Sequence, residues 1–593
     1  MSLPKSLYTL LAHHFSTATK TTTRLPKLSN VPHKYKSEAV ERAQKVLTDY
    51  LHATRGFSFP SAEHISKNCR FSLTNIIKRV DFSVPSFSNR IQRFLRYHPI
   101  NEFEFFFESI GIDYSQVCHF VPPNKYFLSE DGTVLDAACE LSAFGFPWNM
   151  LGKLYEEELS IFSESSKVLK ARLSRFKEYG FGNHSVVGMC LAFPYLLSLE
   201  GDLGGDIVAL FDDLKRVFVE FDIENSAEGN LESWYELCKK VRVFYDLGCE
   251  NGKIGEFLGR RKDVFLECPA EVLFQKAKYF CKFGVRKEDV GLLLLQSPEI
   301  LNLDLETPVI SALGLLKHFG FDMKELEAVS EKYPHAMGRN KMANLPHLVR
   351  ALDLHEWFFT KIKNEHQLLA NYVISDFDED IAEEFSDGLE RIQSSSTPIH
   401  TMTKLNFLHG IGFGENPLTL PVLARLHGRS SELQKRFDSL LSTGIEFSKL
   451  CLMIRTAPKI LNQSPESLEA KVKFISEEMK PSLEYLNIFP AFLCFDLENR
   501  IKPRYRFYVW LKEKGLYSKS YSIASIIATS EKKFVARVFG IHPAAPKHCT
   551  SYQLEDGAFV EHVYVTINGT GLQCLRSASM GVVQAKPVSR KKL

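Results

Sequence analysis

The chain has 593 residues, of which 45% are hydrophobic and 24% are charged, and its net charge is +2. This composition is that of an ordinary folded protein and excludes wholesale disorder, a collagen-like repeat and a long coiled coil. A chain of this length exceeds what one hydrophobic core normally serves, so several domains or an extended repeat array are expected. Because the net charge is close to zero, any binding to a polyanion has to depend on where the charges lie.

The first 37 residues carry basic residues and no acidic residue, the first acid being Glu38. Leucines near the start have the spacing of a short amphipathic helix, and a run rich in Ser and Thr follows. This combination is typical of a transit peptide. We expect residues 1–37 to direct import into the mitochondrion, with the chloroplast as the alternative organelle and a basic arm as the alternative to import. Residues 38–89 are expected to form a helical lead-in.

Glycine recurs along the chain with a spacing of about 35 residues, which indicates a repeat. Apolar residues stand eleven, seven and four positions before each glycine; one copy has Leu169, Leu173 and Phe176. These steps place the side chains on one stripe of a helix. The glycine is expected to end that helix, because it adopts the left-handed conformation without steric cost. The clearest markers of this position are Gly180, Gly248, Gly284, Gly320 and Gly444.

A second apolar-periodic segment follows each glycine and predicts a second helix. A proline stands fourteen positions after the glycine in four copies, and Lys262 takes this place in a fifth. Proline cannot continue a helix, so we expect it to close the second helix, and an apolar pair behind it can fill the seam to the next repeat. The motif prolines are Pro194, Pro298, Pro334 and Pro458, and Pro490 fits a last copy without its glycine.

Each repeat is therefore predicted to be a helix pair whose two apolar stripes are buried by stacking on its neighbours. The expected fold is all-α, a superhelical solenoid of helical repeats of about 35 residues. Residues 90–337 are expected to form an N-terminal repeat array and residues 401–540 further repeats with a basic closing segment. Residues 338–400 are interpreted as a divergent, acidic insertion or as decayed repeats. Residues 541–593 leave the helical pattern, and we expect a disordered tail.

The glycine-to-proline spacing and the Pro-x-Ile/Leu-Leu ending of the repeat resemble the mitochondrial transcription termination factor (mTERF) family, in particular its plant members. The closing segment Leu497–Arg506 and the later Phe534–Arg537 are similar to the end of plant mTERF arrays. The resemblance covers most of residues 90–540. It implies a superhelical solenoid that binds double-stranded nucleic acid through its concave face and acts in organelle gene expression.

The candidate nucleic-acid-binding residues lie in the closing segment. Between Asn499 and Arg537 there are ten basic residues against Glu513 and Glu531. Phosphate contact needs Lys and Arg along one face, although a solvated basic face without a ligand has the same pattern. The aromatic residues between them are interpreted mainly as core. The candidates are Arg500, Lys502, Arg504, Arg506, Lys512, Lys514, Lys532, Lys533 and Arg537.

The sequence contains no signature of catalysis, of a metal site or of a cofactor site. The twelve cysteines are scattered, without the close pairs of a zinc site. Asp376, Asp378 and Asp380 resemble the start of a calcium loop, but that loop needs Gly and Glu where Ile381 and Asp387 stand. No apolar run is long enough to span a bilayer. We expect a protein that is not an enzyme, holds no metal or cofactor and contacts no membrane.

The function expected first is binding of double-stranded DNA to regulate mitochondrial transcription or its termination. A second hypothesis is organelle RNA binding in intron splicing or RNA maturation. A third hypothesis, of another class, is a protein-interaction scaffold, because helical solenoids often bind proteins and the net charge is low for a DNA binder. The expected partners are duplex DNA or organelle RNA and other proteins of organelle gene expression, and the protein is expected to be a monomer.

Overall fold

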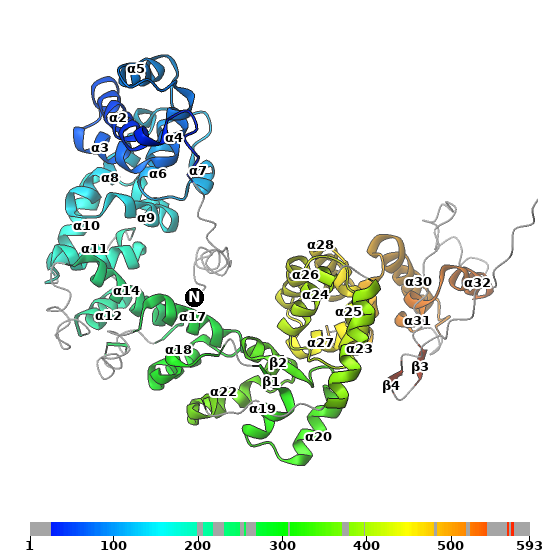
Figure 1. Cartoon of the computed structure of the whole chain (residues 1–593). Coiled ribbons are helices and arrows are strands. Elements are labelled where there is room, and N and C mark those ends of the chain that lie inside the picture. Colours follow the sequence, from blue (N-terminus) through cyan, green and yellow to red (C-terminus); the bar gives the residue numbers. More distant parts are fainter. Residues whose placement is uncertain are drawn as a thin grey trace, which may run out of the picture. The chain divides into compact units, whose positions relative to one another are not determined.

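The residues that the computed structural model describes are 25–178, 180–198, 205–216, 230–249, 254–255, 268–305, 309–370, 379–395, 398–479, 483–517, 522–541, 566–568 and 571–573. Most of the predicted transit peptide and of the predicted tail, Lys262 and the acidic run around Asp376 lie outside these residues. The chain forms two compact units, Met1–Ala277 with Lys287–Leu301, and Lys278–Arg286 with Asn302–Leu593. Both units consist of packed helices (Figure 1), and the predicted all-α repeat fold is confirmed.

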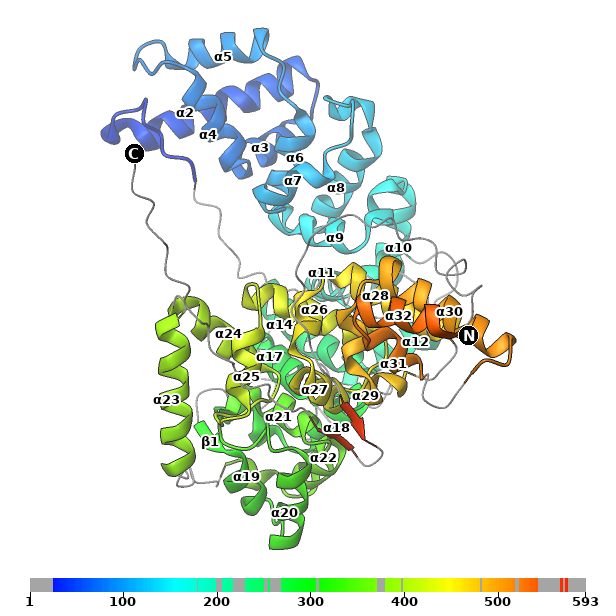
Figure 2. The ribbon, with the colours of Figure 1, turned by 90° about the vertical axis from the view of Figure 1, so that its right-hand side faces the viewer.

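The first unit starts with four α-helices that precede the repeats: α2 (Lys36–Asp49), α3 (Phe59–Asn68), α4 (Arg70–Arg79) and α5 (Phe87–Tyr97). Helix α2 packs against the other three, and α5 lies on the outer side of this group in both views (Figures 1 and 2). The carboxylate of buried Glu108 accepts hydrogen bonds from the backbone N–H groups of Phe71 and Ser72 and thereby caps α4. Burial raises the pKa of this carboxyl group.

The rest of the first unit alternates α-helices with short 3₁₀-helices. The last residues of α17, from Lys278 on, and the last residue of η8, Asn302, belong to the second unit. The elements are α6 (Glu102–Ser109), α7 (Tyr114–Phe120), η3 (Leu128–Glu130), α8 (Gly132–Phe144), η4 (Trp148–Met150), α9 (Leu151–Glu157), η5 (Leu159–Ser163), α10 (Ser166–Glu178), α11 (Asn183–Ala192), η6 (Pro194–Leu197), α12 (Gly205–Lys215), α14 (Leu231–Asp246), α17 (Ala270–Cys281), α18 (Lys287–Gln296) and η8 (Pro298–Asn302).

The second unit contains the remaining repeats, and its main core is a cluster of buried side chains that lie between Ala351 and Ile527 in the sequence. A short antiparallel ribbon pairs β1 (Val309–Ser311) with β2 (Arg339–Lys341), and β3 (Thr566–Asn568) pairs with β4 (Gly571–Gln573) in the tail. None of the described helices of either unit is long and apolar enough to cross a membrane.

The first helices of the second unit are α19 (Ala312–His318), α20 (Met323–Lys332), η9 (Met342–Asn344), α21 (Leu345–Ala351), α22 (His355–Asn364), η10 (His366–Leu369), α23 (Glu379–Ser395), α24 (Pro398–Gly410) and α25 (Thr419–Arg425).

The repeat has three elements, as the copy formed by α26 (Ser430–Ser442), α27 (Phe447–Thr456) and η11 (Pro458–Asn462) shows. Gly444 ends the first helix with a φ of +92°, a value that glycine adopts without the steric cost of a Cβ atom. The other glycines of this position have φ values of +103° (Gly111), +126° (Gly145), +92° (Gly180), +76° (Gly248), +79° (Gly284), +94° (Gly320) and +97° (Gly412).

The third element is a short 3₁₀-helix that begins at the motif proline, where the sequence predicted only the end of the second helix. The residue before the proline has nearly the same backbone in three copies: φ −129° and ψ 72° at Phe193, −134° and 68° at Ala457, and −133° and 67° at Phe489. Proline forces this residue out of the α-helical region and is itself suited to the first position of a helix. The apolar pair of each such copy is buried. Pro334 instead begins a turn after α20.

Residues 345–369, within the segment interpreted as an insertion or decayed repeats, form a copy with the same three elements, α21, α22 and η10. Asp353 takes the place of the glycine with a φ of +58°, and His366 takes the place of the proline. Asp is one of the few non-glycine residues that tolerate a positive φ. The helix α23 that follows lies against α24 and α25 (Figure 2). Its Phe385 is buried in the core, while Glu383, Glu384, Asp387 and Glu390 are exposed.

Candidate nucleic-acid interface

The predicted binding residues lie in the last described helices of the second unit, which follow its repeats. The last three helices, Lys502–Glu513, Ile523–Ala528 and Glu531–Ile541, lie together in Figures 1 and 2. They pack around a small core of Phe507, Leu511, Ile526, Phe534 and Val538. The elements are α28 (Pro465–Phe474), the π-helical turn η12 (Ile475–Met479), α29 (Tyr485–Ile488), η13 (Pro490–Cys494), the π-helical turn η14 (Leu497–Ile501), α30 (Lys502–Glu513), α31 (Ile523–Ala528) and α32 (Glu531–Ile541).

Arg504, in the middle of the predicted site, has a fully buried side chain with an exposed fraction of 0%. Its guanidinium group donates hydrogen bonds to the backbone carbonyl oxygens of Ile526 (2.8 Å), Ile527 (3.0 Å) and Thr529 (2.5 Å). The same group pairs with the carboxylate of Glu531 at 2.5 Å and lies 4.4 Å from the centre of the Phe534 ring. Arg504 therefore holds the C-terminal end of α31, and its donors point into the protein.

Arg500 also binds carbonyl groups inside the protein, whereas Lys502 is paired at the surface. The Arg500 guanidinium donates to the carbonyl oxygens of Ile527 (2.9 Å), Ala528 (3.2 Å) and Thr529 (3.0 Å), while its plane covers the ring of Phe495. Lys502 forms an ion pair with Glu498. The last carbonyl groups of a helix have no partner within the helix and carry partial negative charge, so two arginines stabilise this end of α31.

The same contact recurs in earlier repeats, and we call the residues that make it the tie cations: Arg172, Arg436, Lys471 and Arg504. Each stands on the first α-helix of its repeat and donates to a backbone carbonyl near the end of that repeat. Arg172 binds the carbonyl oxygen of Leu197, Arg436 that of Leu461 at 2.9 Å, and Lys471 that of Leu493 at 3.0 Å. Burial lowers the pKa of Lys471.

Sequence reasoning missed Arg172, Arg436 and Lys471 and interpreted Arg504 as a candidate phosphate contact, although a signal for an internal role was present. Arg172 and Arg436 both stand eight positions before the glycine of their repeat, between apolar positions of the helix stripe. Lys240, Lys276 and Lys404 occupy the same position in other copies. A cation that recurs within the buried stripe indicates an internal contact, because a phosphate-binding side chain has to reach solvent.

The other predicted cations are exposed. On α30 and directly after it these are Arg506, Lys512 and Lys514, and on α32 they are Lys532, Lys533 and Arg537. We call these six residues the C-terminal cations. They stand away from Phe507, Leu511, Phe534 and Val538, which bury the inner faces of the two helices.

The aromatic residues of α30 belong to the packing of the segment. Phe507 and Tyr508 are buried, Trp510 stacks on Phe507 with ring centres 5.8 Å apart, and Tyr505 donates a hydrogen bond to the carbonyl oxygen of Glu478. These contacts agree with the interpretation of the aromatic residues as core. The ammonium group of Lys512 lies 5.2 Å from the centre of the Tyr508 ring.

The described residues offer little for other chemistry. No group of three or more His, Cys, Asp or Glu side chains among them is arranged to hold a metal ion. Burial raises the pKa of the thiols of Cys190, Cys238 and Cys451, so these cysteines stay protonated and unreactive at neutral pH.

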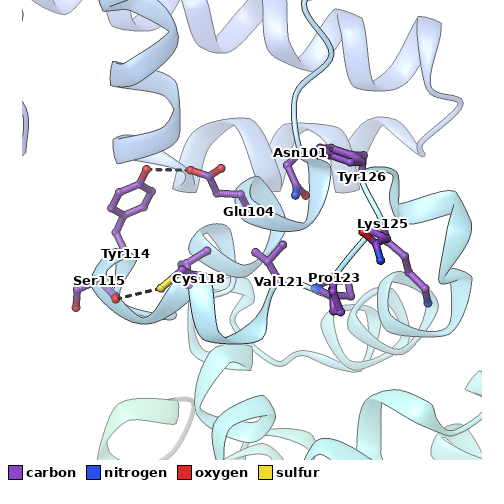
Figure 3. Close-up of a pocket in the computed structure, with 12 residues that line it drawn as sticks. Asn101, Glu104, Tyr114, Ser115, Cys118, Val121, Pro123, Lys125 and Tyr126 are labelled. Atoms are coloured by element: carbon purple, nitrogen blue, oxygen red, sulfur yellow. Dashed lines mark hydrogen bonds between the residues drawn. The ribbon is translucent and has the colours of Figure 1, made fainter.

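One surface pocket of about 620 Å³ lies in the first unit, between α6, α7 and residues 121–126 (Figure 3). In it the hydroxyl group of Tyr114 donates to Glu104 at 2.9 Å, and burial together with this carboxylate raises the pKa of Tyr114 to about 12. Lys125 is the cation of the lining, and it forms an ion pair with Asp131 at 2.9 Å. A pocket with an acidic group and a neutralised lysine does not suit a phosphate ligand.

Comparison with known proteins gives matches along most of the chain. A family model described as mTERF matches residues 226–353 and 396–535. Transcription termination factor MTEF18, mitochondrial, of Arabidopsis thaliana is 54% identical over 549 residues, which cover 92% of this chain and 97% of that protein. Transcription termination factor MTERF8, chloroplastic, of the same plant is 28% identical over 25% of this chain and 30% of its own length. Transcription termination factor MTERF4, chloroplastic, of Oryza sativa subsp. japonica is 29% identical over 19% of this chain and 20% of its own length.

Proposed function

We propose that this chain, which belongs to the mTERF family, binds double-stranded DNA in mitochondria and thereby regulates transcription or its termination. Its mitochondrial localisation follows from the relative at 54% identity, whose name places it there and which matches 92% of the chain. That relative is named a transcription termination factor, as are the two shorter matches. This supports binding of nucleic acid in organelle gene expression rather than catalysis.

The C-terminal cations are the observation that carries the proposal of a nucleic-acid ligand. The net charge of the chain is only +2, so phosphate binding requires local concentrations of cations. Six of the nine predicted cations have exposed side chains on α30, α32 or the residue after α30, where they can reach phosphate groups. Arg500 and Arg504 are left out of the proposed interface, because their donors bind backbone carbonyl groups inside the protein. Lys502 is left out because its ammonium group is already paired with Glu498 at the surface.

The experiment measures the affinity of the full chain for duplex DNA, structured RNA and single-stranded DNA between about 50 and 200 mM salt. Duplex DNA is expected to bind most tightly, with an affinity that falls steeply and linearly on a log-log plot, since each neutralised phosphate adds about 0.9 to the slope. Tighter binding to structured RNA would make RNA the ligand. No binding to any of the three at low salt would contradict the proposal and favour a protein scaffold.

A variant with Arg506→Gln, Lys532→Gln and Lys533→Gln tests the location of the interface. Its salt slope is expected to fall by about 0.9 for each phosphate contact that is lost. The matched control is Lys45→Gln, Lys324→Gln and Lys435→Gln, which removes three charges from exposed positions on α2, α20 and α26. If the control flattens the slope as much as the variant does, net charge and not the C-terminal cations determines binding.

A further inference from the structure

Helix α5 in the first unit carries three exposed arginines, Arg90, Arg93 and Arg96, which we call the α5 arginine face. Steps of three residues keep these side chains within one third of the helix circumference, and Arg90 and Arg96 are about 9 Å apart along the axis. The opposite face is apolar and buried: Phe87, Ile91 and Leu95 have exposed fractions of 0%, 1% and 2%. The arginines are therefore held on a helix that the fold fixes in place.

The α5 arginine face is not neutralised by acidic neighbours. Arg93 and Arg96 form no ion pair or hydrogen bond with other residues in the part of the chain that the structure describes, and Arg90 donates only to the backbone carbonyl oxygen of Asp81 at 3.2 Å. Residues 70–101 contain six Lys or Arg residues and one acid, Asp81, although the net charge of the whole chain is +2. Packing of the fold leaves these guanidinium groups free to bind an anion.

We propose that the α5 arginine face binds the phosphate backbone of nucleic acid and is a second contact surface, separate from the C-terminal cations. This inference rests on the proposed function. Duplex DNA carries one negative charge for about every 1.7 Å of its axis, so three arginines along about 9 Å of helix can each reach a phosphate. Helix α5 lies outside the segments that match the mTERF family model, which begin at residue 226.

Two other accounts of the α5 arginine face fit the structure less well. The terminal element of a repeat array needs a polar outer face, but mixed charges would serve that purpose, and α5 carries arginines without an acid. A membrane-binding amphipathic helix inserts its apolar face into lipid, whereas the apolar face of α5 is buried against the rest of the fold. A phosphate backbone requires only the exposed face.

The test compares the full chain with a variant carrying Arg90→Gln, Arg93→Gln and Arg96→Gln. The probes are a random-sequence DNA duplex across a salt series and vesicles of phosphatidylcholine and phosphatidylserine in equal parts. Hydrogen exchange of α5 verifies that the variant keeps the helix. We expect the slope for the duplex to fall by up to about 2.7 and the affinity at low salt to fall about tenfold or more, with little binding to vesicles by either protein.

The control with Lys45→Gln, Lys324→Gln and Lys435→Gln is expected to keep most of the slope. This inference would be overturned if the chain without substitutions binds duplex DNA and the α5 variant shows the same salt slope. The proposed function would then still stand. Loss of vesicle binding with an intact duplex slope would also overturn it, because the surface would then serve a membrane. If the unchanged chain binds neither duplex nor RNA, both the proposed function and this inference fail.

Discussion

Replacement of Arg504 by Met tests whether the tie cations belong to the fold rather than to the binding surface. The substitution keeps most of the side-chain stem that packs under Phe534 and removes every donor. Of the three carbonyl oxygens that Arg504 binds, those of Ile527 and Thr529 also accept from Arg500, so that of Ile526 loses its arginine donor altogether.

The expected cost follows from these contacts. A hydrogen bond to a charged group contributes about 1.5 to 3 kcal/mol, and a buried carbonyl left without a partner costs about 1 to 3 kcal/mol. The carboxylate of Glu531 is about half exposed, with a side-chain exposure of 49%, so it regains water and adds little. We expect a local loss of about 3 kcal/mol, which corresponds to a rise of about a hundredfold in the opening of α31.

Hydrogen exchange of the backbone amides in α31 and α32 measures this opening directly, without requiring the whole chain to unfold in one step. The matched control is Arg506→Met on the exposed side of the same helix, with an expected effect below about 0.5 kcal/mol. If Arg504→Met changes the protection of α31 less than about threefold, or if both variants lower it equally, the assignment of Arg504 to the fold is wrong.

Two further predictions concern other parts of the fold. Burial, and to a lesser extent the charge of Arg455, lowers the pKa of His335 to about 3, and neither ring nitrogen has a partner among the described residues. The imidazole has the higher pKa in the unfolded chain, so the unfolded chain takes up this proton first as the pH falls. The free energy of unfolding should therefore decrease by about 1.4 kcal/mol per pH unit from about pH 6.5 towards pH 3. Denaturant titrations of His335→Leu should not show this part of the decrease. Gly444→Ala should cost about 1 to 2 kcal/mol, since its φ of +92° is strained for Ala but no atom lies within 4 Å of the added Cβ. Gly111→Ala should cost clearly more, because its Cβ would meet the carbonyl oxygen of Asn149; equal losses in thermal melts of the two variants would contradict this reasoning.

The repeat could be predicted because its markers act through local backbone chemistry. A glycine with positive φ and a proline that excludes helix from the residue before it fix the phase of each copy. The 3₁₀-helix after the proline is too short to show a periodic pattern, so the sequence indicated only an ending. The copy at residues 345–369 was harder to detect, because Asp353 and His366 replace both markers while the backbone keeps its form.

The candidate site could be predicted only in part, because counting charges does not show where a side chain points. The density of Lys and Arg indicated residues 499–537 as the binding site. Arg500 and Arg504, however, donate hydrogen bonds to backbone carbonyl groups of α31. The α5 arginine face is one helix with three arginines, and only the buried opposite face and the lack of acidic partners distinguish it. Both facts depend on tertiary packing.

The tie cations also determine how stability is divided along the array. Arg172 and Leu197, and likewise Arg436 and Leu461, are 25 residues apart, so each tie joins two ends of the same repeat and crosses no seam. In a one-dimensional array, such contacts add to the intrinsic stability of a repeat and not to its coupling with the next. Loss of a tie should therefore lower the protection of its own repeat from hydrogen exchange more than that of the next repeat.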